Sequence, residues 1–409
     1  MPPPALQLDE LVEEILLRIP PGEPERLARA ALACKRWRRL ASSPGFRRRF
    51  CARHGAPPLL GVLRNIVGWD WEYTDLDIVD REYPEIDVTG FAVDSLHGRV
   101  LLHSTPPMFQ TVGSFAVWDP VTDGHWELPA LPRLPQQYGW KAAVLCNVTN
   151  GACDHLDCSQ GPFLVAFVGA ENSRVFSSIY SSEAGVWSEP KYTPWYGYLA
   201  GGVRAALVGN TLYFVLAEPT GILECDLSTG EMTVAYLPPP PNGRFVLTTA
   251  EDGGLGTLTL EGSRLYLWSR EAGPDGEMRW AKGKLIELET FLSVGAKLIS
   301  FDMVGFEAGV GVVYVGTKDA SFIIHLKSGQ VCTIGGFNSS GDIVPYMGFY
   351  TPASEPKGLA APDAVYEQEH KVVPEELGVG VQEEPVPEAD PNFSSTSLAD
   401  QGRGNDLYR

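Results

Sequence analysis

The first fifty residues contain two short amphipathic segments that are too small to bury their own apolar faces. In the first segment, 8–21, apolar residues recur at i, i+3, i+4 and i+7, the spacing of one helical face. Asp9 and Glu10 fall in its first turn, where the helix dipole favours carboxylates, and Pro20 stops it. The second segment, 24–44, carries an apolar face with arginine and lysine around it. We therefore predict two helices whose apolar surface requires a partner.

Three motifs follow one another in these segments. L-x-x-E-I-L-x-R-I-P spans residues 11–20, C-K-x-W-R-x-L spans 34–40 and S-x-P-x-F spans 42–46. In this order they resemble the F-box, the helical module that docks a substrate receptor onto the Skp subunit of a cullin-RING ubiquitin ligase. The Leu-Pro pair that often opens the first helix of that family is absent, and Gln7 and Leu8 stand there instead. The resemblance implies that eight residues are divided between the module's own core and the Skp interface: Leu11, Ile15, Leu16, Ile19, Pro20, Cys34, Trp37 and Leu40.

Two other interpretations of the N-terminal segments remain open. The helices could form a terminal hairpin that packs on the rest of the chain, or an arginine-rich nucleic-acid reader. The basic residues of the second segment flank a Trp and Cys stripe rather than form an exposed polar recognition face, which disfavours the reader.

Charge is distributed unevenly along the chain. Residues 1–60 hold 11 basic and 6 acidic side chains, which gives +5, whereas residues 352–409 hold 4 and 12, which gives −8. Because the whole chain carries −19, the middle carries −16. A domain this acidic repels phosphate backbones and anionic lipids, so we expect no nucleic-acid partner and no membrane partner. No apolar run approaches the roughly 20 residues of a membrane span, which predicts a protein of the cytoplasm, the nucleus or both.

Residues 57–351 lack the helical period and alternate short β-branched and aromatic runs with Gly, Pro, Asp and Asn turns, which predicts an all-β array. Turn glycines at Gly124, Gly230 and Gly329 are 106 and 99 residues apart, close to two units of 50. This period predicts a β-propeller of about six four-stranded blades, kelch-like in repeat length. The apolar runs at 57–63 and 344–350 are predicted end strands that share one blade, which would leave no open edge.

The middle of the chain also resembles the F-box-associated propeller of a large plant family. The pieces that carry the resemblance are HGRVLL, WDPVT, CDHLDC with GPFLVAFVG, GGLGTLTLEGSRLYLWSRE and IVPYMGFYTP. Trp69, Trp71 and Tyr73 lie among acidic residues early in this region, and aromatic anchors ringed by charge are typical of recognition surfaces. We treat these three as a weak target-binding hypothesis beside the alternative of an inter-strand loop.

The remaining sequence signals argue against chemistry on this chain. The motif CDHLDC offers Cys153, His155 and Cys158 with Cys146 upstream, but the spacing differs from paired C-x-x-C zinc knuckles, so we predict no metal and no cofactor. No phosphate loop, nucleophile elbow or H-E-x-x-H pair occurs. Residues 352–409 are rich in Glu, Pro, Ala and Ser, which predicts a disordered acidic tail.

These observations lead to one functional hypothesis and two alternatives. Residues 1–56 would form the F-box helical module and residues 57–351 the domain that recognises a target protein. The chain would then be a non-catalytic substrate receptor that joins the target to a cullin-RING ligase through Skp. The first alternative is a propeller that binds a small molecule or glycan, with helices that are only structural. The second alternative is a propeller enzyme.

Overall fold

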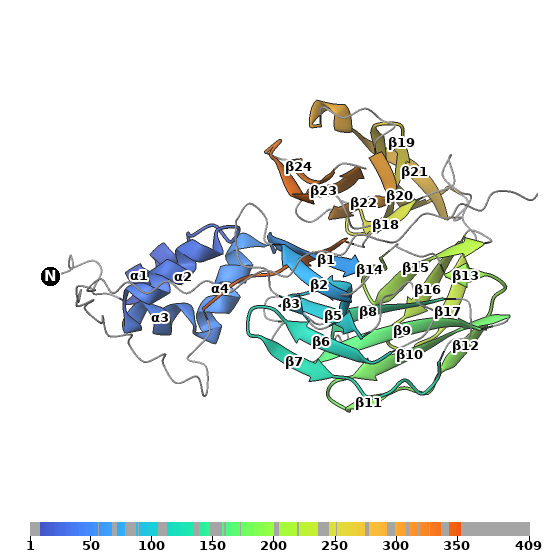
Figure 1. Ribbon diagram of the computed structural model, residues 1–409, viewed down its shortest axis with the longest axis horizontal. Coiled ribbons are helices and arrows are strands. Elements are labelled where there is room, and N and C mark those ends of the chain that lie inside the picture. The colour runs from blue at the N-terminus through green and yellow to red at the C-terminus, as the bar shows by residue number, and fades with distance from the viewer. Residues whose placement is uncertain are drawn as a thin grey trace, which may run out of the picture. The chain divides into compact units, whose positions relative to one another are not determined.

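A computed structural model describes the chain from residue 9 to residue 352, with gaps (Figure 1). The gaps are 56, 68–71, 78–86, 89, 105–112, 135–138, 148–157, 159–160, 172, 200–203, 219–220, 236–244, 251, 275–277, 293–298, 308–310, 318–319, 327 and 337–342. Of the predicted disordered tail, all but Pro352 lies outside the described residues.

Four helices come first, and they form the blue group in Figure 1: α1 (Asp9–Leu16), α2 (Pro24–Ala33), α3 (Lys35–Ala41) and α4 (Pro44–His54). Asp9 and Glu10 occupy the first turn of α1, as predicted. Among the described helices, none combines the length and apolar character required to cross a lipid bilayer.

The single second helix predicted from the sequence is wrong. Cys34 has extended backbone angles, φ −162° and ψ 158°, so it ends α2 and precedes α3. Pro44 does not only end a helix but also begins α4, where Ser43 caps the first turn by accepting a hydrogen bond from the Phe46 amide at 3.2 Å. What looked like one apolar stripe along 24–44 is therefore divided between two short helices.

The helical module has a small apolar core of its own. Val12 and Leu16 of α1 meet Leu27 of α2 and the two phenylalanines of α4, Phe46 and Phe50, and all five are at most 1% exposed. The Phe46 and Phe50 rings stack 5.7 Å apart. Since Phe46 and Phe50 are four residues apart, they lie on one face of α4, which is the face that closes the core.

The remaining chain folds into six antiparallel sheets, numbered here in chain order. Sheet 1 consists of β1 (Leu59–Val67), β2 (Glu72–Asp77), β3 (Asp87–Val88) and β26 (Ile343–Met347). Sheet 2 consists of β4 (Phe91–Leu96), β5 (Arg99–His103), β6 (Phe115–Asp119) and β7 (Gly124–Glu127). Sheet 3 consists of β8 (Trp140–Cys146), β9 (Phe163–Glu171), β10 (Arg174–Ser181), β11 (Val186–Trp187) and β12 (Lys191–Pro194).

The second half of the β domain continues the same plan. Sheet 4 consists of β13 (Tyr198–Leu199), β14 (Ala206–Val208), β15 (Thr211–Glu218), β16 (Gly221–Asp226) and β17 (Met232–Ala235). Sheet 5 consists of β18 (Val246–Thr249), β19 (Leu255–Glu261), β20 (Arg264–Ala272) and β21 (Met278–Glu287). Sheet 6 consists of β22 (Ile299–Glu307), β23 (Val312–Thr317), β24 (Ala320–His325) and β25 (Val331–Gly336).

An apolar cluster joins each sheet to the next one in the chain, and a further cluster joins sheet 6 to sheet 1. In each cluster, buried residues of the two sheets contact one another. The first three interfaces contain Leu63 and Leu102 (sheets 1 and 2), Leu101 and Val144 (sheets 2 and 3), and Ala143 and Leu223 (sheets 3 and 4). The other three contain Ile222 and Leu247 (sheets 4 and 5), Leu258 and Val313 (sheets 5 and 6), and Tyr314 and Val62 (sheets 6 and 1). The sheets are thus linked in cyclic order, which is the arrangement of a β-propeller.

The predicted plan of about six four-stranded blades needs correction. Among the described strands, only five blades, not six, consist of strands that follow one another in the chain, and two of these five blades have five strands instead of four. The remaining sheet is composite, because β26 from the end of the domain pairs with β1 in antiparallel register, Val62 opposite Pro345 and Leu63 opposite Val344. The predicted sharing of one sheet by the runs 57–63 and 344–350 is confirmed.

Turn residues follow the predicted glycines with one exception. Gly230 and Gly329 have positive φ values of 70° and 72°, which glycine adopts without steric cost. In the earlier unit, however, the left-handed residue is Asp123, with φ 55°, and Gly124 begins β7. The predicted turn residue, Gly124, is therefore one position later than Asp123, the residue that has the left-handed conformation.

Candidate functional site

Helix α1 has an apolar stripe that is wider than the face it buries. Val12 and Leu16 are 1% exposed in the module core, whereas Leu11 and Ile15 are 45% and 49% exposed. Leu11 and Ile15 are four residues apart and therefore lie side by side on the helix. They form an apolar edge that the described part of the chain leaves open to solvent.

Ion pairs fix the orientation of α1 and so determine which face stays open. Asp9 pairs with Arg36 of α3, and Glu13 pairs with Arg49 of α4. Glu14 lies 3.4 Å from the Arg53 guanidinium, also of α4. Exposed pairs of this kind contribute little free energy singly, roughly 0–1 kcal/mol. Together they tie the acidic side of α1 to the helices behind it.

The other residues proposed for Skp binding separate into three environments. Leu16 belongs to the core. Ile19, Trp37 and Leu40 are half-buried and pack against that core. Pro20 and Cys34 are exposed.

The structure adds one residue that the sequence reasoning missed. Leu32, near the end of α2, is 79% exposed, more than any other large apolar side chain among the described residues. A signal was available, because Leu32 directly follows Ala31 of the apolar face and precedes the C-K-x-W-R-x-L motif. An exposed leucine beside this motif is a candidate interface residue.

The proposed aromatic target-binding cluster is not brought together by the described residues. Trp69 and Trp71 lie outside them. The backbone of Tyr73 belongs to β2, opposite Ile66 of β1. The target-binding role of these three residues stays a prediction.

The helical module contacts the end of the β domain through α4. The Arg47 Nε donates a hydrogen bond to the Thr351 hydroxyl at 2.9 Å, and Thr351 is 1% exposed. The Phe50 ring meets the Phe349 ring edge-on, with centroids 6.1 Å apart. The segment after β26 is therefore packed against the module core.

Polar side chains also join neighbouring sheets. The side-chain Nδ2 of Asn65 donates to the Ala92 carbonyl, and the backbone amide of Ala92 donates to Asn65 Oδ1, both at 2.8 Å. This pair of hydrogen bonds links sheets 1 and 2. Asp94 of β4 accepts from the Val144 amide at 3.1 Å and from Arg204 Nη2 at 3.0 Å. These buried groups fix the position of one sheet against another.

Glu171 of β9 is the most strongly paired buried carboxylate of sheet 3. It is 2% exposed, and Arg133 Nη2 and Arg174 Nε both donate to it at 2.7 Å. Burial opposes ionisation of this carboxyl, but the hydrogen bonds from Arg133 and then Arg174 outweigh it and hold its pKa below the ordinary value. Both guanidinium groups bind the same carboxylate, which indicates that Glu171 stabilises the fold.

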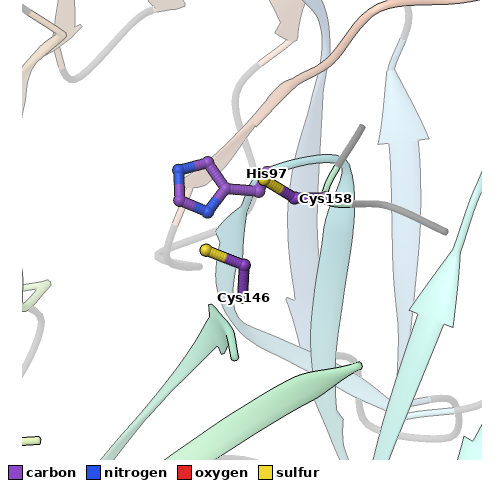
Figure 2. A group of neighbouring side chains, drawn as sticks. All are labelled: His97, Cys146 and Cys158. Carbon is purple, nitrogen blue, oxygen red and sulfur yellow. The ribbon is translucent and has the colours of Figure 1, made fainter. Parts of the chain in front are cut away.

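One cluster of metal-ligating residue types occurs among the described residues. His97, Cys146 and Cys158 place one ligand atom each within 4.8 Å of one another, and Figure 2 shows the three side chains gathered together. Burial lowers the pKa of His97 to about 4, with a smaller contribution from the Arg99 charge. Cys153 and His155, which the sequence also suggested, lie outside the described residues.

Two solved structures show a distant similarity to this chain. A structure of a nidogen and laminin complex aligns with a TM-score of 0.40 at 11% identity, covering 72% of this chain and 99% of that one. A periplasmic gluconolactonase of Pseudomonas aeruginosa aligns with a TM-score of 0.39 at 12% identity, covering 67% and 82%. These likenesses support no inference about activity. No curated protein matches the chain.

The helical module, by contrast, matches a family. Residues 9–53 fit the family model described as F-box-like. This range begins with α1 and ends one residue before α4 does. The chain therefore has an F-box-like domain at its N-terminal end, followed by a β-propeller.

Proposed function

We propose that this protein is the substrate-receptor subunit of a Skp-cullin-F-box ubiquitin ligase. The observation that carries the proposal is the open apolar edge of α1, Leu11 and Ile15, within the segment that matches the F-box-like family. An F-box-like domain implies an adaptor of the Skp type as partner. Apolar side chains held on a rigid helix are suitable anchors for such an interface, because they lose little conformational entropy on binding.

The proposed mechanism needs no catalytic residue on this chain. The F-box-like module would hold the Skp subunit, and the propeller would hold a target protein, so that the lysines of the target stay close to a charged ubiquitin-conjugating enzyme. The rate gain comes from effective concentration and orientation. Such a receptor would work in the cytoplasm or the nucleus.

The charge of the module supports an acidic partner. Residues 1–60 carry +5, and the arginines of α3 and α4 that pair with α1 retain exposed surface, for example Arg39, whose side chain is 74% exposed. A basic surface raises the association rate with an acidic protein, and it does so less at high salt. Binding to a Skp subunit should therefore weaken as salt rises.

Co-purification of the full chain with a Skp subunit tests the proposal. Ile15→Asp places a charge in the apolar edge, and we expect at least about 30-fold weaker binding, equivalent to ~2 kcal/mol for a buried interface anchor. Because Ile15 is 49% exposed, the variant should fold normally.

A matched control is Val186→Asp, which puts the same charge at an apolar residue of the propeller that is 59% exposed. It should bind the Skp subunit as wild type does. Wild-type protein that fails to bind, or an Ile15→Asp variant that binds as tightly as wild type, would refute the proposal.

A further inference from the structure

One histidine of sheet 2 lies close to two cysteines from the β8–β9 part of sheet 3. His97 lies in the turn between β4 and β5 of sheet 2. Cys146 is the last residue of β8, and Cys158 precedes β9, both in sheet 3. From this placement we propose that His97, Cys146 and Cys158 form a zinc site that clips sheet 2 to sheet 3.

The distances suit zinc. The three ligand atoms lie within 4.8 Å of one another. In a tetrahedral site with Zn–S near 2.3 Å and Zn–N near 2.0–2.1 Å, donor atoms are separated by roughly 3.5–3.8 Å. Small side-chain rotations therefore bring all three donors to bonding distance of a common centre.

The backbone holds the ligands in fixed positions. His97 and Gly98 have φ values of 52° and 78°, as a two-residue hairpin turn of the primed type requires. The Tyr346 hydroxyl donates to the Gly98 carbonyl at 3.3 Å, which ties this turn to β26. On the other side, the Asn147 amide donates to the Pro162 carbonyl at 3.0 Å, so the end of β8 stays paired beyond Cys146.

A buried cation, Arg99, lies beside the two thiols. The Arg99 guanidinium interacts electrostatically with both thiols, and it is held in place by donating to the Gly161 carbonyl and by lying 5.0 Å from the Phe163 ring centroid. A bound Zn²⁺ would itself deprotonate the thiols that coordinate it, and two thiolates would balance its charge, which makes the clip neutral beside the buried Arg99.

The donor set selects the kind of metal. Two sulfurs and an imidazole are soft or borderline ligands, which prefer zinc to magnesium or calcium. Cys146 and Cys158 are buried, at 3% and 8% exposure, and His97 is half-buried. Three protein donors would leave the fourth zinc position to a water or a further donor, and the burial of the two cysteines limits access to it.

The sequence alone did not lead to this site, because its third ligand is distant along the chain. His97 precedes Cys146 by 49 positions and belongs to the previous sheet. Only the cyclic packing of sheets 2 and 3 brings it to the two cysteines. The prediction of no metal was based on the spacing within CDHLDC.

Metal analysis of the full chain, purified without chelator, tests the proposal. We expect a single Zn²⁺ per chain by mass spectrometry of the metal. Replacing it with Co²⁺ should give a thiolate-to-cobalt charge-transfer band together with the visible bands of tetrahedral cobalt. The double variant Cys146→Ser with Cys158→Ser should lose both the zinc and the band.

The matched control is Cys225→Ser with Cys332→Ser, which removes two buried thiols from other sheets and should retain the metal. His97→Asn should weaken zinc binding at least about 10-fold, because changing a residue that only orients a ligand already costs that much and here a ligand itself is lost. The cobalt experiment uses wild-type protein, so it stays decisive even if a variant fails to fold. A wild type without the charge-transfer band, a double cysteine variant with full zinc content, or a Cys146 to Cys158 disulfide in freshly alkylated protein would each overturn the proposal.

Discussion

The helical module and the propeller differ in how completely they bury their apolar side chains. In the propeller, each sheet is sealed against both neighbours by a buried cluster. In the module, α1 and α2 contain three of the ten large apolar side chains that are exposed among the described residues, although these helices are short.

The difference reflects how each region gains stability. A ring of sheets has no free end, so the inner strands of each sheet find a neighbouring sheet, and exposed apolar side chains such as Val186 and Met278 are left to the outer strands. Four short helices enclose only one small core, and any apolar residue beyond that core remains at the surface. An exposed apolar edge is therefore informative in the module, where binding would cover it.

The largest expected effect tests whether the module core is as well packed as the propeller. Phe50→Ala should lower the free energy of unfolding of the helical module by about 3–5 kcal/mol, because Phe50 is 1% exposed and packs on Phe46 and Phe349. Far-UV circular dichroism during urea unfolding measures the loss of helix.

Leu223→Ala provides the matching deletion in the propeller, where Leu223 is 0% exposed between sheets 3 and 4. It should cost about 2–5 kcal/mol in the transition of the sheets. If Phe50→Ala cost less than ~1 kcal/mol, the module would be loosely packed throughout, and its exposed leucines would lose their significance as an interface.

An intermediate effect tests the polar packing of the propeller. Because the pKa of Glu171 is lowered in the folded protein, its ionisation contributes stability above the unfolded pKa of about 4.3, and this contribution is lost as pH falls through the folded pKa. Glu171→Gln should thus cost about 1–3 kcal/mol at neutral pH and progressively less below pH ~4.

Urea unfolding of wild type and variant across a pH series measures this difference. Glu189→Gln, at an exposed carboxylate of the same region, should change stability little at any pH. A Glu171→Gln difference that does not shrink in acid would mean that Glu171 contributes by packing and not by charge.

The smallest expected effect concerns the open edge of the module. Leu11→Ser should change stability by less than about 0.5 kcal/mol, because Leu11 is 45% exposed and makes no part of the core. Thermal unfolding of the isolated chain checks this. A large loss of stability would show that Leu11 already has a structural role and is not reserved for a partner.

Local patterns in the sequence predicted the local elements well. The period of α1 and its acidic first turn were predicted, and so was the pairing of the two end runs in β1 and β26. The latter succeeded because a ring of sheets needs closure, which is a global requirement that both apolar runs satisfy.

Features that depend on packing were missed. Cys34 looks like one more residue of a helical stripe, and only its extended backbone separates α2 from α3. Helix α4 was overlooked because arginines surround its two buried phenylalanines, although Ser43 and Pro44 form a recognisable helix start. His97 could not be assigned to Cys146 because nothing local connects them.

The composite sheet has a consequence for synthesis on the ribosome. Until residues 343–347 have been translated, β1 has no β26 beside it and presents an unpaired edge. The nascent propeller must therefore wait for nearly its last strand before it closes, while the helical module, complete by residue 54, can fold much earlier.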